Sequence, residues 1–256
     1  MKTQLLIYGV LSLLLFSCMP SEGAYEPVSK VIPVSADLSL VPYPKLSDYH
    51  FFVGDIKNQT PSPRVLPYEP ASSLFTDYAK KKRFVWMPNG TQALYNSSDS
   101  VLLLPIGGVL IKTFYYDDVY PKGVGTKIIE TRLMIRKNNG WTFANYKWND
   151  SQTDAFLILN DNDIEVPITW IENGMSSMTT NYKIPATSSC IQCHSLNNNI
   201  LPIGIKPQNL HNDYNYSGVY QNQLSKWVQH GFLQGNFPGK IIPTVNYKDV
   251  TKSLNL

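Results

Sequence analysis

The chain has 256 residues and a formal net charge of +3, and 43% of its residues are hydrophobic, 16% charged and 12% aromatic. This length suits one large domain, or one domain with a small appendage, and the composition permits a sizeable core in which aromatic residues favour strands. The densest basic run is Lys80 to Arg83. It is too short to indicate nucleic-acid binding, which excludes DNA and RNA as partners.

The first 17 residues have the features of a signal peptide. Lys2 precedes an apolar stretch over residues 5–16. That stretch is too short to span a hydrocarbon core of ~30 Å as a helix. Leu15-Phe16-Ser17-Cys18 resembles the signal peptidase II site of bacterial lipoproteins, in which Cys18 becomes the lipidated N-terminus. The alternative is an ordinary secretory signal in which Cys18 has no role.

Residues 18–45 are expected to form the lipidated N-terminus and a tether, because the segment is rich in Pro, Ser and Val without periodicity. A lipid anchor places the protein in the bacterial cell envelope. Met19 after Cys18 favours the outer membrane, facing the periplasm, by analogy with enterobacterial sorting. Further along, Ser72 to Arg83 predicts a helix with a serine N-cap and basic residues in its last turn.

Residues 46–183 predict a β-rich domain. Lys127 to Arg136 alternates between apolar and charged residues, and Asn138-Asn139-Gly140 indicates a hairpin turn into the next strand. The other expected strands are Phe84 to Met87, Val101 to Leu104, Gly108 to Tyr116, Trp141 to Trp148, Ala155 to Leu159 and Ile164 to Ile171. Several short strands at regular spacing predict a mainly β fold, an antiparallel sandwich or a barrel.

Residues 184–256 are expected to form a small helical, cytochrome c-like segment. Cys190 to Leu196 and Gln221 to Leu233 read as helices, the second with Leu224, Trp227, Val228 and Phe232 on one face. The predicted fold is therefore a β-rich domain followed by a small helical segment.

Cys190-Ile191-Gln192-Cys193-His194 is a Cys-x-x-Cys-His sequence, the motif of covalent haem c attachment. Thiols one helical turn apart reach the two vinyl groups of one porphyrin, and the following His binds the iron as proximal ligand. One covalent haem is therefore expected at Cys190, Cys193 and His194. If Cys18 carries lipid, these are the only cysteines left in the exported protein, where an isolated close pair needs a role.

Two other readings of the cysteine pair are weaker. A structural zinc site needs four ligands, and the chain has no second cysteine pair. A thioredoxin-like dithiol needs a strand–helix setting, in which the following His is unusual.

The other bonds of the proximal His are less determined. Its far ring nitrogen is expected to donate to a nearby carbonyl, for which Pro202 and Pro207 are candidates, unless that loop is a plain turn. No Met follows Met178, so a downstream Met cannot be the sixth iron ligand. The position is expected to be weakly ligated or open, and His230 is the best protein candidate if it is filled. The three histidines His50, His211 and His230 otherwise read as surface residues, and Met175 and Met178 as packing residues.

Several sequence blocks, together with the haem motif, resemble a family of bacterial conserved hypothetical lipoproteins described as dihaem c-type cytochromes. The resemblance covers roughly residues 46–233. The longer relatives continue into a second Cys-x-x-Cys-His, which this chain lacks, so it is expected to be a single-haem member or a truncated product. The blocks are Leu74 to Ala79, Lys82 to Pro88, Gly108 to Phe114, Glu130 to Leu133, Trp141 to Ala155, Cys190 to His194, Pro202 to Gly204 and Asn222 to Leu224.

Three functions are compatible with these features. The first is electron transfer through the haem, with a redox partner protein that the sequence does not specify. The second is a haem enzyme or enzyme subunit, peroxidase-like, with an open sixth iron position. The third is a partner-binding lipoprotein in which the β domain carries the function.

Overall fold

The computed structural model describes residues 32–121, 125–171, 176–235, 241, 243–246 and 249. The predicted signal peptide and Cys18 lie outside the described residues. Residues 32–256 form one compact unit, which contains both the β-rich part and the C-terminal helices. The short helices are η2 (Leu46–Tyr49), η3 (Ile56–Asn58), η4 (Thr187–Ser189), α2 (Cys190–His194), α3 (Pro207–Leu210) and α4 (Gln223–Gln229).

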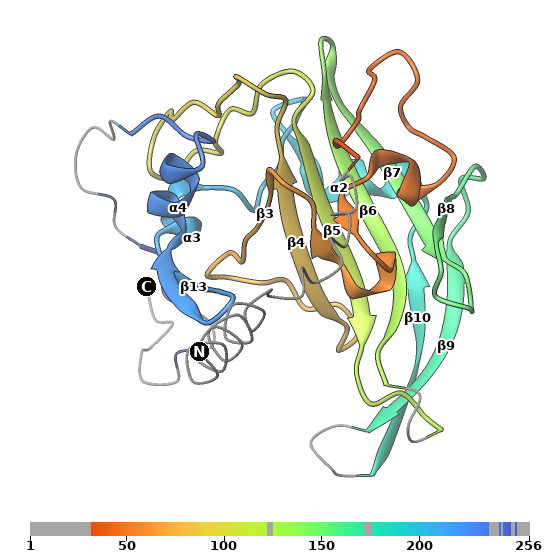
Figure 1. Ribbon diagram of the computed structural model, residues 1–256. Coiled ribbons are helices and arrows are strands. Elements are labelled where there is room, and N and C mark those ends of the chain that lie inside the picture. Colours follow the sequence, from red (N-terminus) through yellow and green to blue (C-terminus); the bar gives the residue numbers. More distant parts are fainter. Residues whose placement is uncertain are drawn as a thin grey trace, which may run out of the picture. The chain divides into compact units, whose positions relative to one another are not determined.

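Strands dominate the described residues, and all their pairings are antiparallel. Six of them form the central sheet, in the order β3 to β8 of the chain; Figure 1 shows this sheet at the centre of the folded unit. These six are β3 (Val65–Pro67), β4 (Lys80–Trp86), β5 (Val109–Tyr116), β6 (Lys127–Lys137), β7 (Gly140–Trp148) and β8 (Ala155–Leu157).

Eight further strands form four separate two-stranded sheets. They are β1 (Phe52–Val53) with β2 (Thr60–Pro61), β9 (Ile164–Ile171) with β10 (Ser177–Ile184), β11 (Ser195–Leu196) with β12 (Asn199–Ile200), and β13 (Asp213–Tyr216) with β14 (Val219–Asn222). The prediction of a mainly β, antiparallel fold with a small helical part near the C-terminus is confirmed. The arrangement as a sandwich or a barrel stays a prediction.

Alternation along the strands gives the central sheet two faces, because successive side chains of a strand point to opposite sides. We call one the N-terminal face, because the N-terminal part of the described chain covers it. It carries the cross-strand neighbours Phe84, Ile111, Leu133 and Ala144. The other, the C-terminal face, carries the next row: Val85, Leu110, Met134 and Phe143. Both faces are covered by other parts of the chain, so strands such as β5 are buried along nearly their whole length.

The N-terminal face is covered by η2, Phe51 and the segment before them. Leu46, Tyr49 and Phe51 are at most 1% exposed and pack with the apolar side chains of this face. Val41 is buried in the same cluster, and the Ser35 amide donates to the Tyr49 carbonyl at 3.1 Å. The described end of the expected tether, from residue 34 onward, therefore belongs to the folded unit.

The C-terminal face is covered in two places. The hairpin β9–β10 packs Ile168, Trp170 and Tyr182 against Phe114 and Tyr116 of β5. Leu210, Leu224 and Trp227, from α3 and α4, pack with Val85, Leu110 and Met134 of the sheet. The predicted apolar side of the α4 region is confirmed, because Trp227 and Phe232 are fully buried in this cluster.

Two predicted elements are wrong. Residues 72–79 form no helix, and Lys80 to Arg83 belong to strand β4. The pairing of β4 with β3 and β5 overrides the local helical preference, because burial of Phe84, Val85 and Trp86 requires an extended chain. Val101 to Leu104 form no strand; Leu103 makes only an isolated bridge with Leu94.

Other expected elements agree closely with the structure. Lys137 pairs with Gly140 across the predicted Asn-Asn-Gly turn, where Gly140 has a φ of +132°. The strand over Ile164–Ile171 has its predicted ends, whereas the helices α2 and α4 are shorter than expected. Among the described residues, no helix has both the length and the apolar character needed to cross a membrane.

Candidate functional site

The Cys-x-x-Cys-His motif forms the whole of α2 (Cys190–His194). Residues three and four apart lie on neighbouring positions of a helix, so Cys190, Cys193 and His194 are side by side. Cys190 and His194 are half-buried, and Cys193 is exposed. Both thiols are free, so the pair is not closed as a disulfide. The structure thus brings the three predicted haem-attachment residues together on one turn of helix.

Polar contacts hold the chain that leads into α2. The Asp163 carboxylate accepts from the Ala186 amide at 2.9 Å, and the Asp161 carboxylate accepts from the Ser188 amide at 3.0 Å. The pKa of the Asp161 carboxyl is lowered first by the Ser188 hydroxyl and then by the Ser188 amide, and that of Asp163 is lowered first by the Ala186 amide. On the other side, the buried Asn145 of β7 donates to the Pro185 carbonyl at 3.1 Å. Sequence reasoning could not find Asp161 and Asp163 as anchors of α2, because each contact joins residues more than 20 positions apart in the chain.

His194 Nδ1 lies 2.8 Å from the Leu201 carbonyl oxygen. A carbonyl only accepts, so Nδ1 carries the proton and the lone pair of Nε2 is free to bind a metal. Burial is the main reason why the pKa of His194 is below its usual value, and this favours the neutral, ligating imidazole.

The acceptor differs from the prediction, since it is neither Pro202 nor Pro207. The hairpin β11–β12 turns at Asn197 and Asn198, both with positive φ, and pairs Ser195 with Ile200. This register brings Leu201 opposite His194, whose carbonyl accepts from the Leu201 amide at 2.8 Å. The signal that sequence reasoning missed is the Asn-Asn pair, which tolerates the left-handed backbone of a two-residue hairpin turn.

The side of α2 that carries Cys190 and His194 faces strand β7 on the C-terminal face. Cys190 Sγ lies 4.0 Å from Asn145 Oδ1, and the His194 ring centroid lies 5.4 Å from that of Phe143. Burial raises the pKa of the Cys190 thiol, while the positive charge of Arg132 opposes the rise. Lys112 and Arg132 act on His194 as well, so two cations of the sheet lie near the motif.

These donors fit a covalent haem. Two free thiols on one helical turn match the two vinyl groups, and a neutral imidazole with a fixed Nδ1–H matches the proximal iron ligand. They do not fit a structural zinc site, which needs four ligands. Among the described residues, no group of three or more His, Cys, Asp or Glu side chains is placed to hold a metal ion.

The other candidate ligands lie in different surroundings. His230 is exposed at the end of α4. Its pKa is lowered mainly by partial burial and further by the positive charges of Lys226 and Arg64. His211 follows α3, and its buried Nδ1 has no hydrogen-bond partner among the described residues. His50, at the end of η2, also has a buried Nδ1 without a hydrogen-bond partner among the described residues. Met178 packs against the β9–β10 cluster. Met175 lies outside the described residues.

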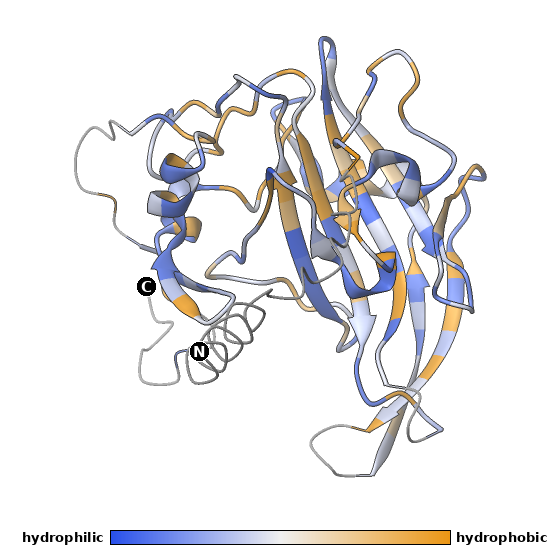
Figure 2. Cartoon of the chain, in the orientation of Figure 1, coloured by the Kyte–Doolittle hydropathy of each residue, from blue (hydrophilic) through white to orange (hydrophobic). Residues whose placement is uncertain are grey.

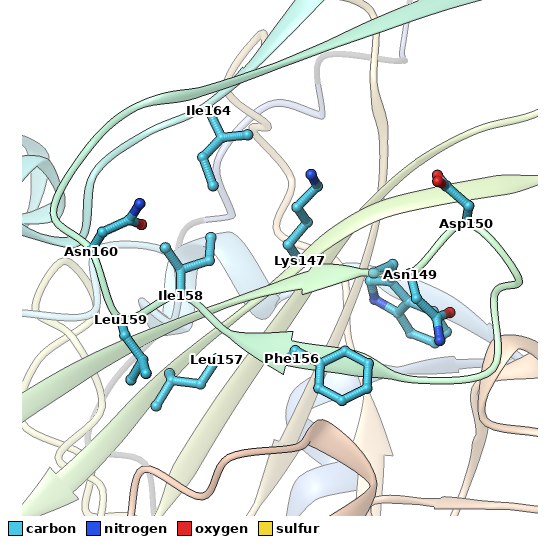
Figure 3. Close-up of a pocket in the computed structure, with 10 residues that line it drawn as sticks. Lys147, Asn149, Asp150, Phe156, Leu157, Ile158, Leu159, Asn160 and Ile164 are labelled. Atoms are coloured by element: carbon cyan, nitrogen blue, oxygen red, sulfur yellow. The ribbon is translucent and has the colours of Figure 1, made fainter.

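A groove of the described residues lies elsewhere. It has a volume of about 660 Å³, and Figure 3 shows Lys147, Ile158 and Ile164 directed into it from β7, from the segment after β8 and from β9. Cys190, Cys193 and His194 do not line it.

Comparisons with known proteins give no relative. No protein-family model matches the chain, and neither a curated protein nor a solved structure is significantly similar to it. The functional argument therefore depends on the residues and their geometry.

Proposed function

We propose that this chain is an exported c-type cytochrome that binds one haem covalently and transfers electrons. Cys190 and Cys193 would form the two thioether bonds, and His194 would be the proximal iron ligand. The haem would supply one-electron redox chemistry. The redox partner is a protein whose identity the chain does not specify.

The observation that carries this proposal is the arrangement of α2 and the hairpin after it. The bond from His194 Nδ1 to the Leu201 carbonyl orients the imidazole and leaves Nε2 as the free donor. The carboxylates of Asp161 and Asp163 hold the chain before Cys190. The motif is therefore presented on a fixed turn of helix, as a covalently bound cofactor requires.

Covalent attachment is tested by expressing the full chain together with a cytochrome c maturation system. Haem staining of a denaturing gel and the intact mass should show one haem per chain, because thioether bonds survive denaturation. The matched variant Cys190→Ala/Cys193→Ala should give no stained band. An unmodified mass for the matured wild-type chain would contradict the proposal and favour a dithiol role.

We propose further that the chain is a lipoprotein of the bacterial cell envelope, anchored through Cys18 in the outer membrane and facing the periplasm. On this proposal, residues 1–17 are removed as a signal peptide, and the sequence blocks quoted above make the chain a relative of the dihaem lipoprotein family. The variant Cys18→Ser should move from the membrane fraction to the soluble fraction. Equal solubility of both proteins would contradict the lipid anchor.

The second candidate is a haem enzyme or enzyme subunit with an open sixth iron position. The exposed position of His230 at the end of α4 favours it, because no hydrogen bond or ring contact among the described residues joins this side chain to α2. Carbon monoxide binding to the reduced protein distinguishes the two candidates. Rapid binding supports the open site; binding only after His230→Ala or His211→Ala identifies that His as the ligand and supports the electron carrier.

A further inference from the structure

A small pocket lies at the end of the central sheet where β4 begins and β5 ends. Figure 2 shows this start of β4, with Lys80 to Arg83, as hydrophilic. The pocket is nevertheless lined by three aromatic side chains from separate segments: Tyr78 before β4, Tyr116 of β5 and Trp170 of β9. We call it the aromatic pocket. It shares no residue with the Cys-x-x-Cys-His motif.

The size of the aromatic pocket limits what it can hold. Its volume is about 90 Å³. Sites that enclose a whole small molecule have volumes of about 300–1,000 Å³. The pocket therefore suits a head group of a few atoms, whose remaining part stays outside.

The three rings are arranged around Trp170. The Tyr116 ring centroid lies 4.9 Å from that of Trp170, with an angle of 48° between the ring planes, and the Tyr78 centroid lies 5.7 Å away at 38°. Trp170 and Tyr116 are 3% and 1% exposed and form a buried wall, whereas Tyr78 is 55% exposed and forms the rim. The face of an aromatic ring carries negative electrostatic potential and attracts cations.

The backbone before β4 holds Tyr78 in this place. Asp77 and Tyr78 have φ angles of 42° and 63°, which residues other than glycine rarely adopt. The Tyr116 hydroxyl donates to the Asp77 carbonyl and fixes this turn to the wall of the pocket. Two successive left-handed residues cost free energy, and such strain gathers where a ligand is bound.

The two carboxylates of the pocket differ in their partners. Asp117 accepts from Lys80 at 3.0 Å and from Thr126 at 2.6 Å. Burial raises the pKa of Asp117, but these two hydrogen bonds outweigh it and lower that pKa, so the carboxylate stays ionised and paired with Lys80. The Asp118 carboxylate has no hydrogen bond or ion pair with another described residue. Because the Asp118 carbonyl accepts from the Ile171 amide at 3.0 Å, its negative charge is fixed beside the pocket.

Further aromatic side chains are exposed next to the pocket. Phe75 is 71% exposed, and its ring packs edge-on against Tyr78 at 5.1 Å. Tyr120 is 60% exposed, and its amide donates to the Thr169 carbonyl at 2.9 Å, beside Trp170. Apolar surface that stays exposed around a pocket can contact the part of a ligand that lies outside it.

We propose that the aromatic pocket binds the quaternary ammonium head group of a small organic cation. The methyl groups contact Tyr78, Tyr116 and Trp170, and Asp118 supplies the opposite charge. Such a head group has no N–H donors, so it needs no hydrogen bonds inside a pocket of aromatic rings. An anion does not fit, because Lys80 is the cation of the pocket and already pairs with Asp117. This binding activity does not depend on the haem.

The test measures the binding of choline to the full chain by isothermal titration calorimetry. Its uncharged isostere, 3,3-dimethylbutan-1-ol, is the matched probe and should bind at least about tenfold more weakly. Tyr78→Leu should weaken choline binding about 3- to 30-fold, because it removes one ring face, whereas Tyr78→Phe keeps the ring and should stay within about threefold. Asp118→Asn should weaken it about 2- to 5-fold, because Asp118 is exposed to solvent. Tyr220→Leu, at an exposed tyrosine of β14, is the control and should change nothing.

The remaining outcomes overturn the proposal in different ways. Equal binding of choline and its isostere would mean an apolar pocket without preference for charge. Tighter binding of glucose than of choline would assign the rings to a carbohydrate. Unchanged binding in Tyr78→Leu, with a far-UV circular dichroism spectrum like that of the wild type, would place the cation elsewhere on the chain. The absence of saturable choline binding to the wild type would remove the site altogether.

Discussion

The two faces of the central sheet differ in how their buried polar side chains are paired, although both faces are formed by neighbouring residues of the same strands. On the N-terminal face, Thr113 bonds to Thr131 at 2.9 Å, and Trp148 Nε1 donates to Thr131 at 3.0 Å. Gln59 donates to Thr113 at 2.7 Å, while the Gln59 Oε1 atom has no hydrogen-bond partner among the described residues. One residue away on each strand, Lys112 and Arg132 face the C-terminal side with a single carboxylate between them.

This difference separates a face of neutral buried polar groups from a face of buried charged groups. Neutral groups that bond to one another need no further partner, and removal of one leaves a buried donor or acceptor unpaired. On the C-terminal face, Glu130 neutralises Arg132, and Lys112 lies against the Phe114 ring. The Cys-x-x-Cys-His motif lies next to this second face.

The largest expected effect removes the proposed covalent attachment of haem beside the C-terminal face. Cys190→Ala/Cys193→Ala should abolish covalent haem completely, while the network of the N-terminal face keeps the sheet folded. Haem staining measures the first effect, and the far-UV circular dichroism of the haem-free protein measures the second. Loss of the β signal in the variant would show that the sheet depends on the haem and not on the network of the N-terminal face alone.

The next largest effect breaks the N-terminal face. Thr131→Val keeps the shape of the side chain and removes the acceptor of the buried Trp148 indole, which should cost about 1–3 kcal/mol of unfolding free energy. Urea unfolding of the haem-free protein measures the change. Thr169→Val is the control, because the Thr169–Thr179 bond is exposed and its loss should have little effect. An equal loss in both variants would argue against the buried network.

The third effect concerns the buried ammonium of Lys112 on the C-terminal face. In the haem-free protein, Lys112→Gln should raise the stability at pH 6 by about 0.5–2 kcal/mol, because it removes a poorly neutralised cation. The pKa of Lys112 is about 7 in the fold, against about 10.5 for a free lysine. The unfolded chain therefore binds more protons between these values, and the wild-type stability should rise as the pH increases from about 7 to about 10.5.

Urea unfolding of the haem-free wild type and of Lys112→Gln at pH 6 and pH 9 measures this dependence. The variant should lose the part of the pH dependence that belongs to Lys112. If both proteins gained the same stability between the two pH values, Lys112 would not be the group that titrates.

The smallest expected effect concerns a solvent-exposed ion pair. Lys80, at the start of β4, pairs with Asp117 at 3.0 Å, and its side chain is 52% exposed. Lys80→Gln should change the unfolding free energy by about 0.5 kcal/mol or less, because solvent screens an exposed ion pair. A loss above about 1 kcal/mol, the upper end for such pairs, would mean that the pair is more important than its exposure suggests.

The sequence determined those features that depend on near neighbours. The Asn138-Asn139-Gly140 turn, the strand over Ile164–Ile171 and the attachment motif at Cys190 to His194 follow from local chemistry and periodicity. The prediction that Lys80 to Arg83 end a helix is wrong. The helical preference of these residues is local, whereas the pairing with β5 that overrides it joins distant parts of the chain.

Only the tertiary structure decided which residues meet. It placed Arg83, Lys112 and Arg132 in one row, since cross-strand neighbours depend on a register that a shift of one residue would send to the other face. It also chose the Leu201 carbonyl for His194 and the carboxylates of Asp161 and Asp163 for the approach to Cys190. The motif predicts covalent haem attachment, and the long-range pairing of the strands determines which side chains surround the motif.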